Sequence, residues 1–288
     1  MEAIAGRLPG AGGRPLHRRH ENRVGVGYAR LRGDRTLKKP VAEAAEWQRV
    51  ADYPRQLQSV RGIAFPATAH PVPIPLDEAG IEGVIDAFEA GARRALKAGF
   101  KVRELHAAHG YLLHEFLSPI SNPRNDQYGG TLENRMRLLL RIAERLRGLM
   151  PEELPLFVRI SATDWVEGGW DIEQSVELAK QLKGVGVDLI DVSSGGTVPQ
   201  ARIPVARGYQ VPFARRIREE VDIRTGAVGL ITEPRYADEI ITSGDANLVF
   251  IAREMLREPY WALKAQQALG EESAWPIQYG YVLKRRAK

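Results

Sequence analysis

Two histidines and a tyrosine lie close together at the end of a short apolar run. His106 and His109 are three residues apart, and Tyr111 follows two residues later. A pair of imidazole N–H groups can bind a carbonyl oxygen and stabilise the negative charge that this oxygen gains during hydride attack. A phenol, with an ordinary pKa of about 10, is suited to protonating a carbon that carries negative charge. These residue types at this spacing indicate a site that polarises a carbonyl group and delivers a proton.

Two other interpretations of the histidine pair stay open on the sequence alone. Both side chains could be held by hydrogen bonds in the core without any role in catalysis. A zinc site is the other alternative, but no third ligand stands at a diagnostic spacing and the helical Glu-x-x-His context is missing. No metal is therefore expected.

The elements around the pair show how it would be positioned. The run from Phe100 to His106 is predicted to be a strand, a polar, Gly-rich loop follows it, and a helix begins at Thr131. A strand that carries titratable side chains into a loop before a helix is typical of active sites in α/β barrels. A preceding helix is predicted from apolar residues with helical spacing between Ile81 and Leu96, and Gly99 would stop it.

Strand and helix patterns alternate along the rest of the chain. Alternation of apolar strands with helices indicates a parallel sheet, and the absence of a GxGxxG at any helix start weakens a dinucleotide-binding fold. The further predicted elements are a helix at 131–150, a strand at 154–162, a helix at 171–186, a strand at 187–194, a helix at 211–221, a strand at 224–231, a helix at 233–244, a strand at 247–252 and a helix at 260–270.

Polar residues at successive strand ends favour a closed (β/α)8 TIM barrel. Such a barrel needs eight strands, and five strand–helix units are clear after residue 100. Arg23 to Leu31 is a candidate for a sixth strand. Residues 1–60 are too short, and too rich in arginine and glycine, for three full units. The prediction is an α/β TIM barrel that is incomplete at its N-terminal strands.

The charge of the chain is concentrated at its start. Residues 1–60 hold 12 of the 41 Lys and Arg residues but only 6 of the 36 Asp and Glu residues, so residues 61–288 are nearly neutral. The arginines of this head form no helical stripe and have no interleaved aromatics, so no nucleic-acid partner is expected. The predicted division is an atypical basic segment at 1–60, a barrel portion at 61–280 and a basic tail at 281–288.

Composition excludes several classes of protein. The chain has no cysteine, which excludes disulfides, Fe–S clusters and thiolate zinc sites. No apolar run approaches the ~18 residues of a membrane span, and no signal-peptide pattern opens the chain. A cytoplasmic protein with no membrane partner is therefore expected.

Two further groups of residues are predicted to bind an anionic ligand. Arg159 lies on the strand at 154–162, where a buried guanidinium needs an anion or an acceptor; a structural ion pair is the alternative. The last two units end in small residues and an arginine, at the barrel position where phosphate commonly binds. The candidate phosphate ligands are the backbone N–H groups of Gly229, Leu230, Ala252 and Arg253 and the guanidinium of Arg253.

The stretch from Glu104 to Arg137, ELHAAHGYLLHEFLSPISNPRNDQYGGTLENRMR, resembles the signature of the old yellow enzyme family of FMN-dependent ene reductases. The resemblance covers about residues 61–280, and the double-histidine form is similar to the bacterial, thermophilic branch. It implies FMN as cofactor, NADPH or NADH as hydride donor, and an α,β-unsaturated carbonyl compound as the small-molecule substrate. His106 and His109 would hold the substrate carbonyl, and Tyr111 would donate the proton.

The resemblance also implies cofactor contacts and is compatible with a homo-oligomer. Arg159 would steady negative charge on reduced FMN, and Ser194, Gly195 and Gly196 would line the flavin edge. The flavin-contacting blocks of the family's first three strands do not appear in residues 1–60, so these residues are not expected to form those strands. Two alternatives follow: a truncated member of the family without activity, and a phosphate-binding barrel isomerase or lyase. No lysine stands at a strand end as a Schiff-base candidate, which counts against an aldolase.

Overall fold

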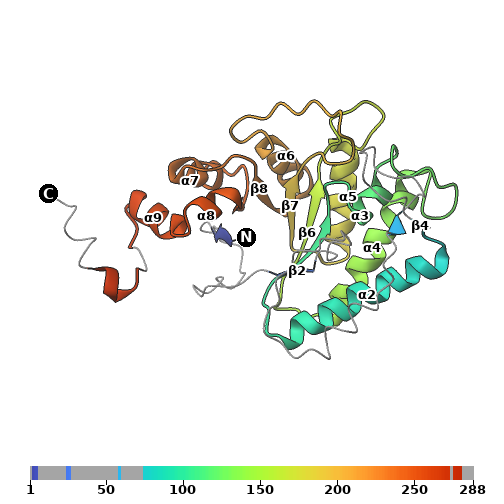
Figure 1. Ribbon diagram of the computed structural model, residues 1–288, viewed down its shortest axis with the longest axis horizontal. Helices are drawn as coiled ribbons and strands as arrows, with labels where there is room; N and C mark the ends of the chain where they lie inside the picture. Colours follow the sequence, from blue (N-terminus) through green and yellow to red (C-terminus); the bar gives the residue numbers. More distant parts are fainter. Residues whose placement is uncertain (1, 6–23, 27–57, 60–73, 273–274, 281–288) are drawn as a thin grey trace. The chain divides into compact units, whose positions relative to one another are not determined.

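The computed structural model describes residues 2–5, 24–26, 58–59, 74–272 and 275–280 (Figure 1). The chain divides into two compact units. The first comprises Met1–His20 together with Pro204–Lys288, and the second comprises Glu21–Ile203. Each unit is described by itself.

The unit of residues 21–203 is built on parallel strands with helices between them. Its strands follow the order β2, β5, β6, β7, and each described neighbour pair is parallel. A two-stranded parallel sheet pairs β3 with β4. The strands are β2 (Val24–Val26), β3 (Gln58–Ser59), β4 (Ile74–Pro75), β5 (Arg103–Ala107), β6 (Leu156–Ser161) and β7 (Leu189–Ser193). The helices are α2 (Glu78–Lys97), α3 (Leu112–Leu117), α4 (Leu132–Leu149) and α5 (Ile172–Gly184).

The long helices of this unit begin at side-chain caps. Asp77 accepts a hydrogen bond from the Gly80 N–H, Thr131 from the Asn134 N–H, and Asp171 from the Gln174 N–H. These bonds satisfy N–H groups that have no partner within the helix, and each typically contributes about 1 kcal/mol. The helices α2 and α4 run side by side (Figure 1) and are joined by an Arg141–Glu82 ion pair. Every residue of β6 and β7 is buried, as expected for strands covered on both faces.

The unit that contains residues 204–288 has three described strands that pair with one another. Strands β8 and β9 are parallel neighbours, whereas β1 pairs antiparallel with β9. An antiparallel strand does not belong to the all-parallel sheet of a barrel, so β1 is not the first barrel strand. The elements are β1 (Glu2–Ala5), α6 (Val211–Val221), β8 (Arg224–Val228), α7 (Pro234–Thr242), β9 (Leu248–Ile251), α8 (Arg253–Arg257), α9 (Trp261–Ala268) and η1 (Ile277–Tyr279).

The strands and helices predicted after residue 75 are all present, with ends that agree within three residues. The loop predicted between residue 107 and Thr131 is wrong in part, because α3 forms there. A six-residue helix is too short to show a helical period, so the pattern did not reveal it. Strand β2 falls within the sixth candidate strand, Arg23–Leu31. The remaining expectations for residues 1–60 and for the tail at 281–288 lie largely outside the described residues, and the division at residues 60 and 280 stays a prediction.

Candidate active site

The three residues predicted to do chemistry are brought together at the end of β5. The ring of His106 lies 5.2 Å from that of His109 and 5.3 Å from that of Tyr111, measured between centroids. His106 is on the strand itself, His109 is in the turn that follows, and Tyr111 is the N-cap of α3. The spacing H-x-x-H-x-Y therefore produces a compact group of three side chains that are all partly accessible.

Two serines hold His109 in place. Its backbone N–H donates to Ser161 Oγ at 2.9 Å, and its Nε2 lies 2.6 Å from Ser193 Oγ. The backbone of His109 has a φ of 60°, which is uncommon for a residue with a side chain, so these contacts stabilise an unfavourable conformation. Nothing in the sequence identifies Ser161 as a partner of the turn.

Burial keeps both imidazoles neutral near pH 7. It lowers the pKa of His106 to about 4 and that of His109 to about 3, and the positive charge of Arg159 acts in the same direction. A neutral imidazole has one N–H donor and one acceptor nitrogen. If Nε2 of His109 accepts from the Ser193 hydroxyl, the proton is on Nδ1 and is available to a ligand. The pair can thus supply two neutral donors to a carbonyl oxygen.

These depressed pKa values predict a loss of stability in mild acid. The unfolded chain takes up protons on both histidines below pH 6.5, whereas the folded chain does so only near pH 4 and below. The free energy of unfolding should therefore fall as the pH drops from 6.5 towards 4. Between pH 6 and pH 5, protonation of the two histidines in the unfolded chain should lower the free energy of unfolding by about 2 kcal/mol.

Urea unfolding at several pH values tests this pH dependence, with the His106→Ala/His109→Ala variant as control. In the variant, the free energy of unfolding should change much less between pH 6 and pH 5 than in the wild type. An equal slope in both proteins would show that the two histidines are not buried in their neutral form.

Arg159 lies beside His106 on the next strand and is compensated by a carboxylate. The pairs His106–Arg159 and Arg159–Asp191 are register neighbours on β5, β6 and β7. The Arg159 guanidinium is 3.5 Å from Asp191 Oδ2, and the Asp191 side chain is fully buried. The structural ion pair is therefore present, and a role of Arg159 towards a flavin stays a prediction. Asp191 was not among the predicted site residues.

Two glycines after β7 let neighbouring backbones approach closely. Gly195 donates its N–H to Thr163 O at 2.8 Å, and its carbonyl accepts from Ser161 Oγ at 2.8 Å. Gly196 has a φ of 98°, and a Cβ on it would lie 2.5 Å from His109 Cα. The loop after β7 therefore packs directly on the turn that carries His109. Ser194, the preceding residue, is buried, and the contact of these three residues with a flavin is not tested by this geometry.

In the unit of residues 204–288, two of the predicted phosphate ligands, Gly229 and Arg253, lie near Tyr209. A Cβ on Gly229 would be 3.0 Å from Tyr209 Cε1, and burial raises the pKa of Tyr209 against the opposing charge of Arg253. Ala252 is the N-cap of α8 and provides no side-chain capping bond, and Arg253 is the first, exposed residue of this helix. Leu230 has a φ of 50° and is exposed. These four residues and the residues of β5, β6 and β7 belong to different units.

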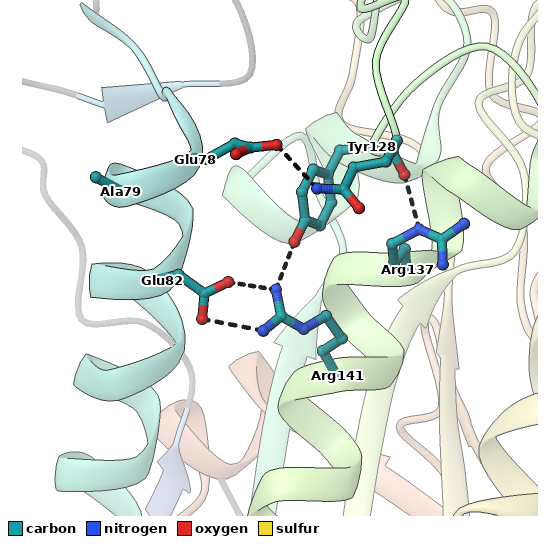
Figure 2. A pocket seen from close by; sticks show the side chains of 7 residues that line it. Glu78, Ala79, Glu82, Tyr128, Arg137 and Arg141 are labelled. Carbon is teal, nitrogen blue, oxygen red and sulfur yellow. Dashed lines mark hydrogen bonds and ion pairs between the residues drawn. The ribbon is translucent and has the colours of Figure 1, made fainter.

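A groove of about 530 Å³ lies elsewhere, between α2 and α4 (Figure 2). Arg141 forms two hydrogen bonds with Glu82 there, and the neutral side chain of Gln127 donates to Glu78. None of its lining residues belongs to the predicted site. Over the described part of the chain, no helix is long and apolar enough to cross a membrane. The same residues contain no group of three side chains suited to holding a metal ion.

Solved structures define the class of fold. A 2-naphthoyl-CoA reductase aligns with a TM-score of 0.69 and 26% identity, over 75% of this chain and 33% of that chain. The old yellow enzyme homologue from Zymomonas mobilis aligns with a TM-score of 0.60 and 24% identity, over 77% of this chain and 64% of that chain. The prediction of an α/β TIM-barrel fold is thereby confirmed.

Sequence comparison identifies the family. The model of the NADH:flavin oxidoreductase / NADH oxidase family matches residues 42–272. An NADPH dehydrogenase from Geobacillus thermodenitrificans is 49% identical over 231 residues, which are 80% of this chain and 67% of that protein. One from Bacillus subtilis is 48% identical over 207 residues, 72% of this chain and 60% of that protein. The chain belongs to this family, as the resemblance indicated.

The matched region differs somewhat from the one predicted. It begins at residue 42 rather than near residue 61, and it ends at residue 272. The chain spans about 60 to 67% of the length of the NADPH dehydrogenases that it matches.

Proposed function

We propose that this chain is an FMN-dependent oxidoreductase that reduces the C=C bond of an α,β-unsaturated carbonyl compound with NADPH or NADH. The observation that carries the proposal is the compact group of His106, His109 and Tyr111 at the end of β5. Membership of the NADH:flavin oxidoreductase / NADH oxidase family supports a flavin and a nicotinamide as the redox partners.

The residues of each unit have features that suit FMN. Gly196 exposes backbone without a side chain beside the histidine turn, the buried Gly195 precedes it, and Arg159 pairs in register with His106 across the sheet. In the other unit, the first N–H groups of α8 do not bond within the helix, as at every helix start, and the side chain of Arg253 is exposed. Both features suit a phosphate group. We propose Ser194, Gly195, Gly196, Arg159, Gly229, Leu230, Ala252 and Arg253 as the FMN ligands. Bound FMN would supply the hydride that the nicotinamide donates.

The chain's own residues bind, orient and protonate the substrate. His106 and His109 donate N–H groups to the carbonyl oxygen, which becomes more negative as a hydride reaches the β-carbon. The phenol of Tyr111 then gives its proton to the α-carbon, so the C=C bond takes up one hydride and one proton. Because both imidazoles are neutral, they polarise the oxygen without competing with Tyr111 as acids.

A flavin titration tests the proposal. The purified chain, supplied with FMN, should retain a yellow cofactor that bleaches when NADPH is added in the absence of oxygen. Cyclohexenone should then restore the colour. Bleaching without reoxidation by the enone would contradict ene reduction but would agree with an NADPH dehydrogenase activity. A chain that holds no FMN would favour the alternative of a truncated, inactive member of the family.

Replacing Arg253 by alanine should weaken FMN binding about 10- to 100-fold, because a charge-assisted hydrogen bond to a phosphate contributes roughly 1.5–3 kcal/mol. Fluorescence titration of the apoprotein with FMN measures this change. Arg257→Ala is a matched control, since this residue is on the same helix and its exposed guanidinium pairs with Glu254. Equal FMN affinity in the Arg253 variant and in the control would show that Arg253 does not bind the FMN phosphate.

A further inference from the structure

A third histidine, His114, is buried behind the candidate catalytic residues. It lies on α3 and is completely inaccessible to solvent. Its Nδ1 is 2.9 Å from the backbone nitrogen of Gly110, and its Nε2 is 3.3 Å from Asp164 Oδ1. We propose that His114, held by Asp164, is a positioning residue that fixes the turn between His109 and Tyr111.

The contacts of His114 define its tautomer. A backbone N–H can only donate, so the Nδ1 that faces Gly110 must be unprotonated. The ring proton is then on Nε2 and points towards the carboxylate of Asp164. His114 is thus a neutral imidazole with an acceptor directed at the turn and a donor directed at Asp164.

Asp164 is fully buried and fully occupied by donors. Its Oδ1 accepts from Thr197 Oγ1 at 2.5 Å, and its Oδ2 accepts from Ser118 Oγ at 2.6 Å and from the Trp170 N–H at 2.8 Å. Burial alone would raise the pKa of this carboxyl, but the hydrogen bonds from His114, Ser118 and Thr197 lower it below its ordinary value. Asp164 therefore stays ionised, and it joins the segments that follow β5, β6 and β7.

The link from His114 to Gly110 acts on the residues that do the chemistry. Gly110 lies between His109 and Tyr111, has a φ of 72°, and packs against the carbonyl oxygen of Gly196 so closely that a side chain would not fit. His114 occupies the third position of α3, from which a side chain commonly reaches back to an N–H at the helix start. Here it reaches one residue further, beyond the cap. The bond therefore couples the start of α3 to the unfavourable backbone conformation of His109.

Two measurements on the wild-type protein test the positioning role without any assay of activity. Long-range ¹H–¹⁵N spectra should show that His114 carries its proton on Nε2 at neutral pH. Hydrogen exchange should show a protected Gly110 amide. A proton on Nδ1 of His114 would overturn the proposal, because that nitrogen could not accept from Gly110.

Two substitutions separate positioning from packing. His114→Asn retains an acceptor near the place of Nδ1, whereas His114→Leu retains the apolar volume but removes the acceptor. The Leu variant should lose protection at the Gly110 amide and lose roughly 10-fold in kcat/KM for cyclohexenone, because small displacements of catalytic groups reduce rates strongly. The Asn variant should stay within about 3-fold of the wild type, since its amide oxygen replaces most of the lost hydrogen bond.

The kinetic comparison rests on the proposed function, whereas the spectra and the exchange data do not. If the chain has no reductase activity, the tautomer and the Gly110 amide still decide the role of His114. Unchanged Gly110 exchange in a folded Leu variant would overturn the proposal. So would equal losses of kcat/KM in the Asn and Leu variants, because that result would show that packing around His114 matters and its acceptor does not.

Discussion

Replacing His106 and His109 together by alanine is expected to lower kcat/KM for an enone by about 10²–10³ while FMN stays bound, because preplaced oxyanion donors typically contribute this much to the rate. The two rings lie 5.2 Å apart and both are neutral, so each can supply one N–H group to the same oxygen. Steady-state kinetics with cyclohexenone and FMN fluorescence measure the two properties separately.

A single substitution of a residue that contacts His109 refines this result. Ser193→Ala removes the hydroxyl 2.6 Å from Nε2 of His109 but leaves both imidazoles, so we expect a smaller loss than in the double variant. Enone affinity equal to that of the wild type in the double variant would show that the oxygen is bound elsewhere. Loss of FMN from the double variant would show that the histidines support the cofactor rather than the substrate.

Replacing Arg103 by leucine is expected to raise the free energy of unfolding by about 3 kcal/mol, because an uncompensated buried charge destabilises a folded protein by several kcal/mol. Arg103 is on β5, and its side chain is completely inaccessible to solvent. Its three guanidinium nitrogens have no hydrogen-bond partner among the described residues. Burial and the neighbouring charge of Arg147 lower the pKa of this guanidinium.

Urea unfolding with an unchanged m-value tests the prediction for Arg103. Arg93→Leu is a matched control, since this arginine is exposed on α2 and pairs with Glu89 at the surface; a change within about 0.5 kcal/mol is expected there. A lower free energy of unfolding in the Arg103 variant would mean that the guanidinium has a stabilising partner.

Much of the local structure could be predicted because it depends on residues that are close in sequence. The helix α4 was placed from its Thr131 cap and its apolar spacing, and α6 was placed at Val211–Val221 without error. The motif from His106 to Tyr111 was also local, so a candidate site could be named before its geometry was known. The same motif carried the family resemblance that the comparisons confirmed.

The tertiary structure alone decided which distant residues complete the candidate site. Asp191 compensates Arg159 from the next strand, and Ser161 and Ser193 hold His109 across the ends of β6 and β7. These partners are between 32 and 84 positions apart in the chain, and no short-range pattern relates them. Parallel pairing brings them together, because it places the C-terminal ends of consecutive strands at one edge of the sheet.

The same physical reason explains what the sequence could not reveal about Arg103 and His114. Both lie in segments whose residue types are ordinary for a strand and a short helix. Only packing shows that Arg103 is buried without a hydrogen-bond partner among the described residues and that His114 is held by Asp164. The sequence by itself determined the alternation of strands and helices, the candidate catalytic motif and the family resemblance. The tertiary structure decided the protonation of the histidines, the ion pair of Arg159 and the bond that holds the turn, because burial and contacts between distant strands set these properties.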